Sequence, residues 1–590
     1  MRKKTLLLAA TLISTNVFCQ LTYNWIKTLN NSDVNGKLIR GIEASNNGNI
    51  YIMGYFSSTT DFDPSSSNYF LSPNISNSCF LAKYTNNGDF IWAKEIIAET
   101  VNNGYEAVND FVIDSNENIY ITGSYEQIVD FDPSPATYTL SAITTINNYT
   151  NYNRFAFTAK YNSSGDLVWV KDIKRATDKY TDKKIGIGIK IELDGNNNVY
   201  IGAQVVDRPF FCKYNDAGKL LWQDSLMTST KYSAIAKLSG FFVSSSGDVY
   251  VGGWFNDDID MNPGVAVNTM YATSAIFLGK YNSNGEFIWG KKLNKNLPLE
   301  IGILDIVTDP LGNIYTCGTG SSGVSYRNQI TKWDINGNLQ WINFFHDQVQ
   351  TILGNGCTDI SISCNNELIV TGYVNDSYSF NRQNYDPLGG TYTCTPNFNS
   401  TTGLSTGSSF AFVASYNTSN GGIKWAKSVG GNLNSPSIVD INNFPNIPSS
   451  NSFIDKSGNI YLFGNLLPIN STTGIPINDF DPNAGLVELN SSTDKSFFAK
   501  YISCGTTILN ENNHTNIINT SPNPSLGEFN FKGLVGENII HIIDIAGRIL
   551  ITEKTFTDNH TLNLDLSKGV YFYRITDKYN RVSQGKLILH

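Results

Sequence analysis

The 590-residue sequence lacks most of the motifs by which catalytic centres are recognised. It has five His and contains no HExxH motif and no G-x-x-x-x-G-K-[ST] phosphate-binding loop. Its formal net charge at pH 7 is −9, and no basic stripe is present that would neutralise phosphates. These absences give no catalytic residue to predict, and they argue against nucleic acid as a partner.

Residues that favour helices are also scarce. Only 16% of the residues are charged and five are Met, whereas the chain has 31 Tyr, 33 Phe and 49 Gly. This composition favours strands and tight turns over helices. Length alone suggests about four domains, but a repeat architecture overrides that expectation.

Cysteine is present but forms no C-x-x-C pair of the kind that binds metals. Eight Cys occur in the whole chain, and an odd number, all but Cys19, remains after removal of residues 1–19. Cys357 and Cys364 lie in one predicted strand, where about 23 Å would separate them, too far for a disulfide. We therefore expect scattered buried thiols rather than a disulfide framework.

The N-terminus predicts a secretory signal peptide. Basic residues at 2–4 precede the apolar run at 6–13, which is too short to span a membrane, and small or polar residues follow. We predict residues 1–19 as the signal peptide, with no membrane span in the mature chain. Cys19 leaves lipidation as an alternative, which the preceding Phe disfavours.

The pattern K-Y-x-x-x-G-x-x-x-W recurs along the chain, once with Trp in place of Tyr. Copies start at Lys83, Lys160, Lys213, Lys280 and Lys332. Each is preceded by D-x-x-G-N-I-Y or a variant, in which Asp or Ser stands six residues before Tyr or Ile. Such short polar side chains start turns by bonding to the backbone two residues on. One repeat therefore predicts two strands joined by a turn, followed by two strands joined by a hairpin.

These strands are apolar on both faces, so both faces need to be covered. Seven four-stranded sheets packed around an axis cover one another, as in a β-propeller. Seven repeat Trp residues agree with seven blades: Trp25, Trp92, Trp169, Trp222, Trp289, Trp341 and Trp425.

The two ends of the repeat region complement each other. The seventh repeat, at about 450–503, lacks a Trp strand of its own, whereas residues 21–29 contain a Trp without a preceding repeat. We predict an all-β chain with a seven-bladed β-propeller of four-stranded antiparallel blades at 20–505. The N-terminal strand is expected to close it by serving as the fourth strand of the last blade, which removes free sheet edges.

Length variation is concentrated in the connections between second and third strands and between successive repeats. Variable loops on a rigid scaffold commonly bind ligands. Several of them contain D-F-D-P or a variant, and paired carboxylates are hard ligands of the kind that Ca²⁺ prefers. The candidate metal residues are Asp61, Asp63, Asp130, Asp132, Asp479 and Asp481. The alternative interpretation is a turn in which the first Asp caps the backbone and the aromatic residue packs on the sheet.

The repeats end near residue 505. Residues 506–520 form an Asn/Thr-rich linker, and 521–590 contain short alternating strands with Gly turns, typical of a small immunoglobulin-like β-sandwich. This last segment resembles the type A C-terminal sorting domain of the type IX secretion system of Bacteroidota. The shared motifs are P-N-P at 522–524, I-x-D-x-x-G-R at 542–548, L-D-L-S-K-G-V-Y at 564–571 and Lys586 in the final strand.

The sorting-domain resemblance implies export across the outer membrane through contacts between 521–590 and the secretion machinery. It also implies removal of the tail, followed by release of the protein or its attachment to surface glycolipid. The repeats resemble a secreted propeller-repeat family with the same D-x-x-G-N-I-Y, D-F-D-P and K-Y…W patterns. That second resemblance implies no particular ligand.

Three functional hypotheses follow. The leading one is a secreted or cell-surface β-propeller that binds a glycan or protein partner without catalysis. The second is a carbohydrate-active hydrolase or lyase that uses carboxylates of the loops between second and third strands. The third is a purely structural surface protein.

Overall fold

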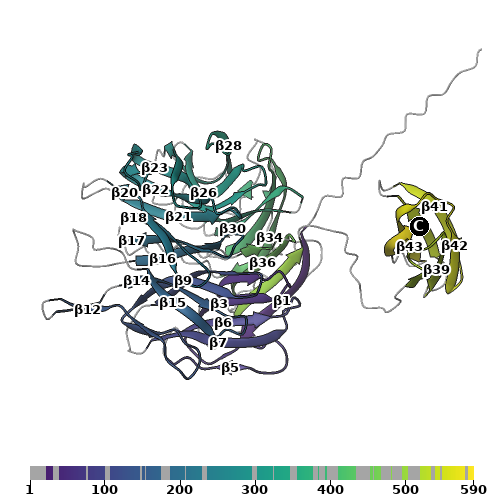
Figure 1. Ribbon diagram of the computed structural model, residues 1–590, viewed down its shortest axis with the longest axis horizontal. Helices are drawn as coiled ribbons and strands as arrows, with labels where there is room; N and C mark the ends of the chain where they lie inside the picture. The colour runs from purple at the N-terminus through teal and green to yellow at the C-terminus, as the bar shows by residue number, and fades with distance from the viewer. Residues whose placement is uncertain are drawn as a thin grey trace, which may run out of the picture. The chain divides into compact units, whose positions relative to one another are not determined.

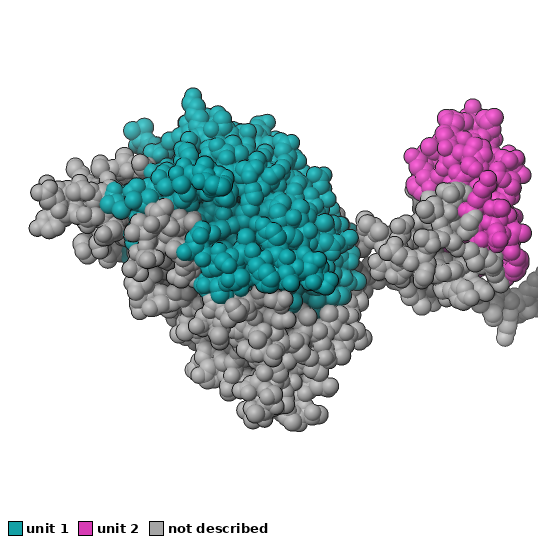
Figure 2. Space-filling model, turned by 90° about the horizontal axis from the view of Figure 1, so that it is seen from below, with its two compact units in different colours: residues 1–504 teal, residues 505–590 magenta. Residues whose placement is uncertain are grey.

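The structure, a computed structural model, is all-β. It describes residues 21–30, 39–74, 78–99, 106–146, 149–152, 154–173, 186–205, 208–228, 235–294, 302–322, 325–345, 355–363, 365–375, 383–384, 393–394, 409–433, 452–455, 457–466, 480, 495–502, 519–532, 534, 538–544, 548–577 and 582–590. Within these ranges no residue is helical. The chain forms two compact units, Met1–Cys504 and Gly505–His590 (Figure 2). The predicted linker lies almost wholly outside the described residues.

The larger unit consists of four-stranded antiparallel modules whose strands pair in the order first, second, third, fourth. Module 1 comprises β2 (Ile39–Ala44), β3 (Ile50–Phe56), β6 (Ser78–Tyr84) and β7 (Phe90–Glu99). Module 2 comprises β8 (Glu106–Ile113), β9 (Ile119–Glu126), β14 (Arg154–Tyr161) and β15 (Leu167–Ile173). Module 3 comprises β16 (Gly186–Leu193), β17 (Val199–Val205), β18 (Arg208–Tyr214) and β19 (Leu220–Ser225).

Modules 4 to 6 continue the same pattern. Module 4 comprises β21 (Ala236–Val243), β22 (Val249–Asp260), β23 (Thr269–Tyr281) and β24 (Phe287–Asn294). Module 5 comprises β25 (Ile303–Thr308), β26 (Ile314–Ser322), β27 (Ser325–Trp333) and β28 (Leu339–Phe345). Module 6 comprises β29 (Asn355–Ile362), β30 (Glu367–Asn375), β33 (Ser409–Asn417) and β34 (Ile423–Leu433).

Module 7 combines the two ends of the repeat region. It comprises β35 (Ser452–Ile454), β36 (Asn459–Leu466), β37 (Lys495–Ile502) and the N-terminal β1 (Thr22–Asn30). Strand β1 pairs antiparallel with β37, with Trp25 opposite Lys500 and Thr28 opposite Phe497. In Figure 1 the purple β1 belongs to the same sheet as the green β36. The predicted pairing of the N-terminal strand with the last repeat is confirmed.

The remaining strands of the larger unit are short and lie in the connections. They are β4 (Thr60–Asp61), β5 (Phe70–Leu71), β10 (Ile128–Asp130), β11 (Thr139–Ser141), β12 (Ile143–Ile146), β13 (Tyr149–Tyr152), β20 (Met227–Thr228), β31 (Gln383–Asn384) and β32 (Thr393–Cys394). Strand β10 of module 2 pairs with β7, the fourth strand of module 1, and β4 of module 1 pairs with β1 of module 7. These connections therefore link neighbouring modules.

The first strands of the modules contact one another in sequence. Contacts run from β2 to β8, β16, β21, β25, β29 and β35, and β35 in turn contacts β2. Burial on both faces is complete in some inner strands, since every residue of β6 and β17 is buried, whereas no residue of the fourth strand β19 is buried. Such burial is possible because each sheet is covered by a neighbouring sheet on either side.

The smaller unit has two sheets that share one core. Strands β38 (Asn519–Ser521), β39 (Glu528–Lys532) and β42 (Asn559–Asn563) form one sheet. The other has the order β41 (Ile549–Thr555), β40 (Asn538–Ile543), β43 (Gly569–Asp577) and β44 (Val582–Leu589). Phe529 and Phe531 from the first sheet pack with Ile540, Ile542 and Ile575 from the second. The arrangement is a two-layer β-sandwich.

Candidate functional site

The D-F-D-P loops, where the sequence predicts calcium ligands, form one repeated hydrogen-bonded turn. Asp61 Oδ1 accepts hydrogen bonds from the backbone N–H groups of Asp63 (3.1 Å) and Tyr69 (2.9 Å). The same pair of bonds forms at Asp130, from Asp132 (3.1 Å) and Tyr138 (2.8 Å). The second carboxylate of each loop also accepts a backbone N–H, at 2.9 Å from Ser65 and from Ser134.

The middle residue of each loop fixes the loop to the core. Phe62, Phe131 and Phe480 are completely buried. Their carbonyl oxygens accept hydrogen bonds from the repeat Tyr of the third strand, at 2.9 Å from Tyr84 and 3.0 Å from Tyr161 and Tyr501. The Tyr of the K-Y motif thus holds the Phe of the D-F-D-P motif in place by a hydrogen bond.

These bonds agree with the turn-capping interpretation of the loops. No group of three or more His, Cys, Asp or Glu suited to a metal ion occurs among the residues that the structure describes. Asp479 and Asp481 lie outside the described residues. Calcium binding at Asp61, Asp63, Asp130 and Asp132 stays a prediction, because a carboxylate oxygen that accepts a backbone N–H keeps a lone pair for a cation.

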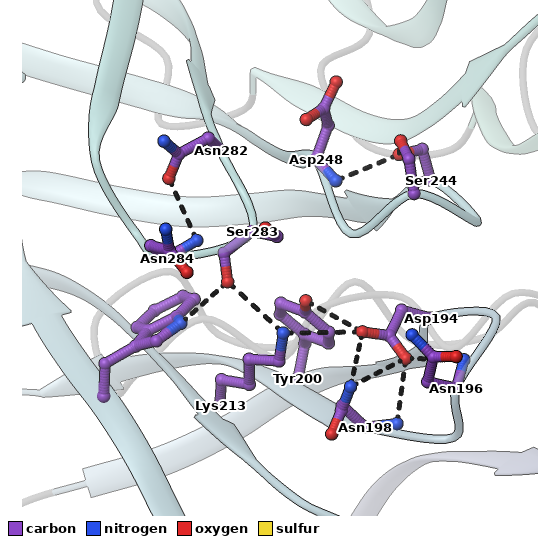
Figure 3. A network of polar contacts seen from close by, with 12 residues as sticks. Asp194, Asn196, Asn198, Tyr200, Lys213, Ser244, Asp248, Asn282, Ser283 and Asn284 are labelled. Atoms are coloured by element: carbon purple, nitrogen blue, oxygen red, sulfur yellow. Dashed lines mark hydrogen bonds and ion pairs between the residues drawn. The ribbon is translucent and has the colours of Figure 1, made fainter.

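The repeat residues Asp, Tyr, Lys and Trp lie at the interfaces between neighbouring modules, here called seams. Figure 3 shows the seam between modules 3 and 4. Lys213 Nζ lies 3.4 Å from Asp194 Oδ2 and donates to the carbonyl of Ser283 (3.3 Å) in module 4. Trp222 Nε1 donates to the same carbonyl (3.0 Å), and Tyr200 O–H donates to Asp194 (3.1 Å). Burial raises the pKa of Asp194, but hydrogen bonds from Asn198 and others outweigh it and hold that pKa below its usual value.

The same Trp bond recurs at other seams. Trp169 Nε1 donates to Asp216 (3.0 Å), and Trp289 Nε1 donates to Ile335 (3.2 Å). Trp25 Nε1, on the N-terminal strand, donates to the carbonyl of Asn86 in module 1 (3.1 Å). The seam between modules 7 and 1 therefore uses the same contact as seams within the continuous chain.

The Gly of the K-Y motif is required by this packing. Gly218 has a positive φ of 74°, and a Cβ there would lie 2.9 Å from the Trp169 ring of the preceding module. A left-handed conformation and the lack of space both favour Gly. The spacing of Gly and Trp along the sequence therefore reflects contacts between successive modules.

Where the turn Asp is replaced by Ser, another carboxylate takes its place. In module 1, which has Ser45, Glu117 of module 2 accepts hydrogen bonds from Ser45 Oγ (2.8 Å) and Asn49 (2.8 Å). Lys83 Nζ lies 2.7 Å from Glu117 Oε2, and both side chains are 11% exposed. Burial raises the pKa of Glu117, but bonds from Lys83, Ser45 and Asn49 outweigh it and lower that pKa from 4.5 to about 2.

A second group of charged residues lies on the first strands, and the sequence interpretation missed it. Asp110, Lys190, Asp305 and Asp359 come from modules 2, 3, 5 and 6. Each directly follows a β-bulge, and each stands four residues before the Asp or Ser that starts the turn. This shared offset of a charged residue from the turn was the signal available in the sequence.

The first-strand carboxylates connect neighbouring modules. Asp110 Oδ2 accepts the N–H of Ile191 (2.9 Å), and Asp305 Oδ2 accepts the N–H of Ile360 (2.9 Å). Lys190 Nζ lies 3.9 Å from Asp110 Oδ1, and their side chains are 21% and 24% exposed. Solvent therefore still reaches this pair.

The pKa values of carboxyl groups on the first strands shift in the opposite direction from those at the turns. Burial raises the pKa of Asp305, and the charge of Asp359 raises it further. Burial and the charge of Asp110 raise the pKa values of Glu43 and Glu192. Carboxyl groups held above their usual pKa are proton donors at higher pH, as general acids are.

Comparison with known proteins identifies the smaller unit. Residues 519–590 match the family described as the secretion system C-terminal sorting domain. The chain is therefore exported to the cell surface or secreted, and the match supports export by the type IX secretion system of Bacteroidota. No curated protein matches the sequence. None of the described residues forms a helix long and apolar enough to cross a bilayer.

Several solved structures are similar to the chain at low sequence identity. PorZ, a surface component of the type-IX secretion system of Porphyromonas gingivalis, is 11% identical, with 96% of this chain and 100% of that chain covered and a TM-score of 0.17. The polysaccharide lyase Uly1 is 10% identical over 58% of this chain and 87% of that chain, with a TM-score of 0.29. Drosophila Plexin A in complex with Semaphorin 1b is 7% identical over 69% and 87%, with a TM-score of 0.28. These scores are too low to support a functional assignment.

Proposed function

We propose that residues 20–505 form a closed seven-bladed β-propeller that binds a glycan on the cell surface or after secretion, without catalysis. The observation that carries this proposal is a set of exposed aromatic rings in or next to the connections between second and third strands, where Tyr271 lies near the start of the third strand β23. Phe70 is 59% exposed, Tyr138 47% and Tyr271 66%. Exposed rings of this kind stack on the apolar faces of sugars.

The contacts between modules support closure of the ring. The first strands contact one another from β2 round to β35 and back to β2. Strand β1 completes module 7, and Trp25 bonds to module 1 as other repeat Trp residues bond to their following modules. A closed ring holds its connections at fixed distances from one another, which suits recognition of an extended partner.

The polar residues of the repeats support a binding role over a catalytic one. Asp61, Asp130, Asp194 and Glu117 all accept hydrogen bonds that hold turns or seams together. A catalytic carboxylate needs an oxygen directed at the substrate. The aromatic rings, in contrast, are directed to solvent.

A glycan array tests the proposal with the full mature chain. We expect the wild type to bind a subset of glycans and a triple variant, Phe70→Ala with Tyr138→Ala and Tyr271→Ala, to lose at least tenfold in affinity. The matched control is Ile91→Ala with Val168→Ala, which removes side chains that are 42% and 52% exposed on fourth strands. Equal binding by the triple variant and the wild type would contradict the assigned surface. Absence of any glycan binding would favour a protein partner or a purely structural role.

The first-strand carboxyl groups favour a second candidate, a carbohydrate-active hydrolase or lyase. Asp305 and Asp359 lie on contacting first strands, and burial and the charge of Asp359 raise the pKa of Asp305, as the pKa of a glycosidase general acid is raised. The test is turnover of a panel of polysaccharides by the wild type and by Asp305→Asn. Turnover by the wild type that the variant lacks would replace the non-catalytic proposal.

A further inference from the structure

Two of the buried thiols are neighbours, contrary to the expectation of scattered cysteines. Cys79, Cys212, Cys317 and Cys357 are free thiols with no exposed surface. Cys317 lies on β26 of module 5 and Cys357 on β29 of module 6, and these two strands are in contact. The two thiol groups are near enough for each to affect the pKa of the other.

The surroundings of the pair hold both thiols in place. The backbone N–H of Cys357 donates to Asn328 Oδ1 on β27 (3.1 Å). Both cysteines belong to one hydrophobic cluster that also contains Ile330 and Ile360. The two cysteines therefore face one shared core across two contacting strands, which is the placement that an inter-strand disulfide requires.

We propose that Cys317 and Cys357 form a disulfide that covalently joins modules 5 and 6. The chain is exported, and exported proteins meet oxidants that cytosolic proteins do not. The oxidant is a protein or small-molecule disulfide, RSSR. One thiolate displaces RS⁻ from it to give a mixed disulfide, and the second thiolate then displaces the other RS⁻. The protein loses two electrons and two protons, and two RSH are released.

The order of events follows from burial. Thiol–disulfide exchange requires a thiolate, and burial raises the pKa of both Cys317 and Cys357. The folded core also excludes the oxidant. The bond therefore forms during folding, before modules 5 and 6 close on each other, and it stays inaccessible to reductants afterwards.

The disulfide would reinforce an interface between modules that also contains like charges. Asp305 pairs with Cys317 across β25 and β26, and Asp359 follows Cys357 on β29. Repulsion between the two carboxylates opposes contact of the modules at this place. A bond between Cys317 and Cys357 limits the separation of the two strands and restricts the unfolded chain.

Peptide mapping of the full mature chain tests the proposal. The protein is refolded from denaturant with oxidised glutathione, denatured again without reductant, alkylated and digested. We expect a cross-linked peptide that contains Cys317 and Cys357, and alkylated Cys79 and Cys212. Protein refolded with a phosphine reductant and then exposed to oxidised glutathione should acquire the bond at least tenfold more slowly. Full alkylation of Cys317 and Cys357 after oxidative refolding, or pairing of either with another cysteine, would overturn the proposal.

Urea unfolding provides an independent measurement. Refolding under reducing conditions should increase the unfolding equilibrium constant of the wild type by about 30-fold, near the lower end of what disulfides give. Cys317→Ala should abolish this dependence on redox conditions, whereas Cys79→Ala and Cys212→Ala should retain it. A redox dependence that persists in Cys317→Ala would contradict the assigned pair. If Cys317→Ala fails to fold, peptide mapping of the wild type still decides.

Discussion

Carboxylates at two places along the same first strands behave in opposite ways. At the turns, Glu117 and Asp194 accept several hydrogen bonds from neighbouring N–H, O–H and ammonium groups, and their pKa values fall. Four residues before the turn, Asp110 and Asp305 are partly buried near other carboxyl groups, and their pKa values rise. The surrounding donors, rather than the residue type, decide whether an acid stabilises this fold.

The largest effect that we expect from this comparison is at Glu117. Its pKa falls from 4.5 to about 2, so its contribution to stability is present above pH 4.5 and is lost as the pH falls from 4.5 towards 2. Glu117→Gln should cost about 3 kcal/mol at pH 7, since one pKa unit corresponds to about 1.4 kcal/mol. Urea unfolding between pH 2 and 7 should show the difference shrinking at low pH.

The control for Glu117 is Glu126→Gln, which alters a more exposed ion pair with Arg154, with side chains 26% and 18% exposed. That change should cost at most about 1 kcal/mol. A Glu117→Gln penalty no larger than that of the control, or one that does not vary with pH, would mean that the turn carboxylate is not stabilised by its donors.

The next largest effect is a gain in stability, expected when the charge of Asp305 is removed. The pKa of Asp305 is raised above 3.8 in the folded protein, so its contribution to stability is greatest below pH 3.8 and falls as the pH rises through the raised value. Asp305→Asn keeps an oxygen that can accept the N–H of Ile360 but removes the charge. We expect a gain of about 1–2 kcal/mol at pH 7 that disappears near pH 3.5, measured by urea unfolding.

Asp194→Asn is the matched control for Asp305→Asn, because it makes the same substitution in a turn. The pKa of Asp194 is lowered in the folded protein, so this variant should lose stability at pH 7 and approach the wild type at low pH. If both substitutions change the free energy of unfolding in the same direction at pH 7, the proposed difference between turn and strand acids is wrong.

A smaller effect is expected in the loops, where Asp61 caps a turn. Asp61→Ala removes the acceptor of two backbone N–H groups and should cost about 1–2 kcal/mol. If capping is the main role, millimolar Ca²⁺ leaves the melting temperature unchanged. A rise with Ca²⁺ that Asp63→Ala with Asp132→Ala abolishes would instead establish a calcium site.

The smallest effect that we expect is the loss of one Trp hydrogen bond between modules, compared at two seams. Trp25→Phe and Trp222→Phe each remove one N–H donor to the next module, so each should cost about 1 kcal/mol. Similar losses, measured by urea unfolding, would support ring closure by the N-terminal strand. No loss at Trp25 beside a clear loss at Trp222 would indicate that the seam between modules 7 and 1 is open.

Much of the strand arrangement was predictable because it depends on local periodicity. The Asp or Ser six residues before Tyr marked the turn between first and second strands, and Tyr315, for example, donates to Asp309 as that spacing requires (3.1 Å). The missing Trp strand of the seventh repeat predicted the pairing of β1 with β37. The motifs of the last 70 or so residues predicted the sorting domain that the family match supports.

Other features were invisible because they depend on contacts between repeats. Glu117 stands at a turn position where most repeats have Gly or Asn. Only the structure shows that its carboxylate accepts hydrogen bonds from Ser45 and Lys83 of the preceding module. The D-F-D-P carboxylates suggested a cation, yet the hydrogen bonds that they accept come from their own loop.

The sequence by itself determined the strands, the turns and the number of repeats, since each follows from side-chain spacing within some 60 residues. The tertiary structure decided which charges meet. Packing of the first strands β25 and β29 brings Asp305 of one repeat near Asp359 of the next, and packing of β26 against β29 brings Cys317 near Cys357. Neither distance is encoded in a single repeat, because both depend on how two sheets pack.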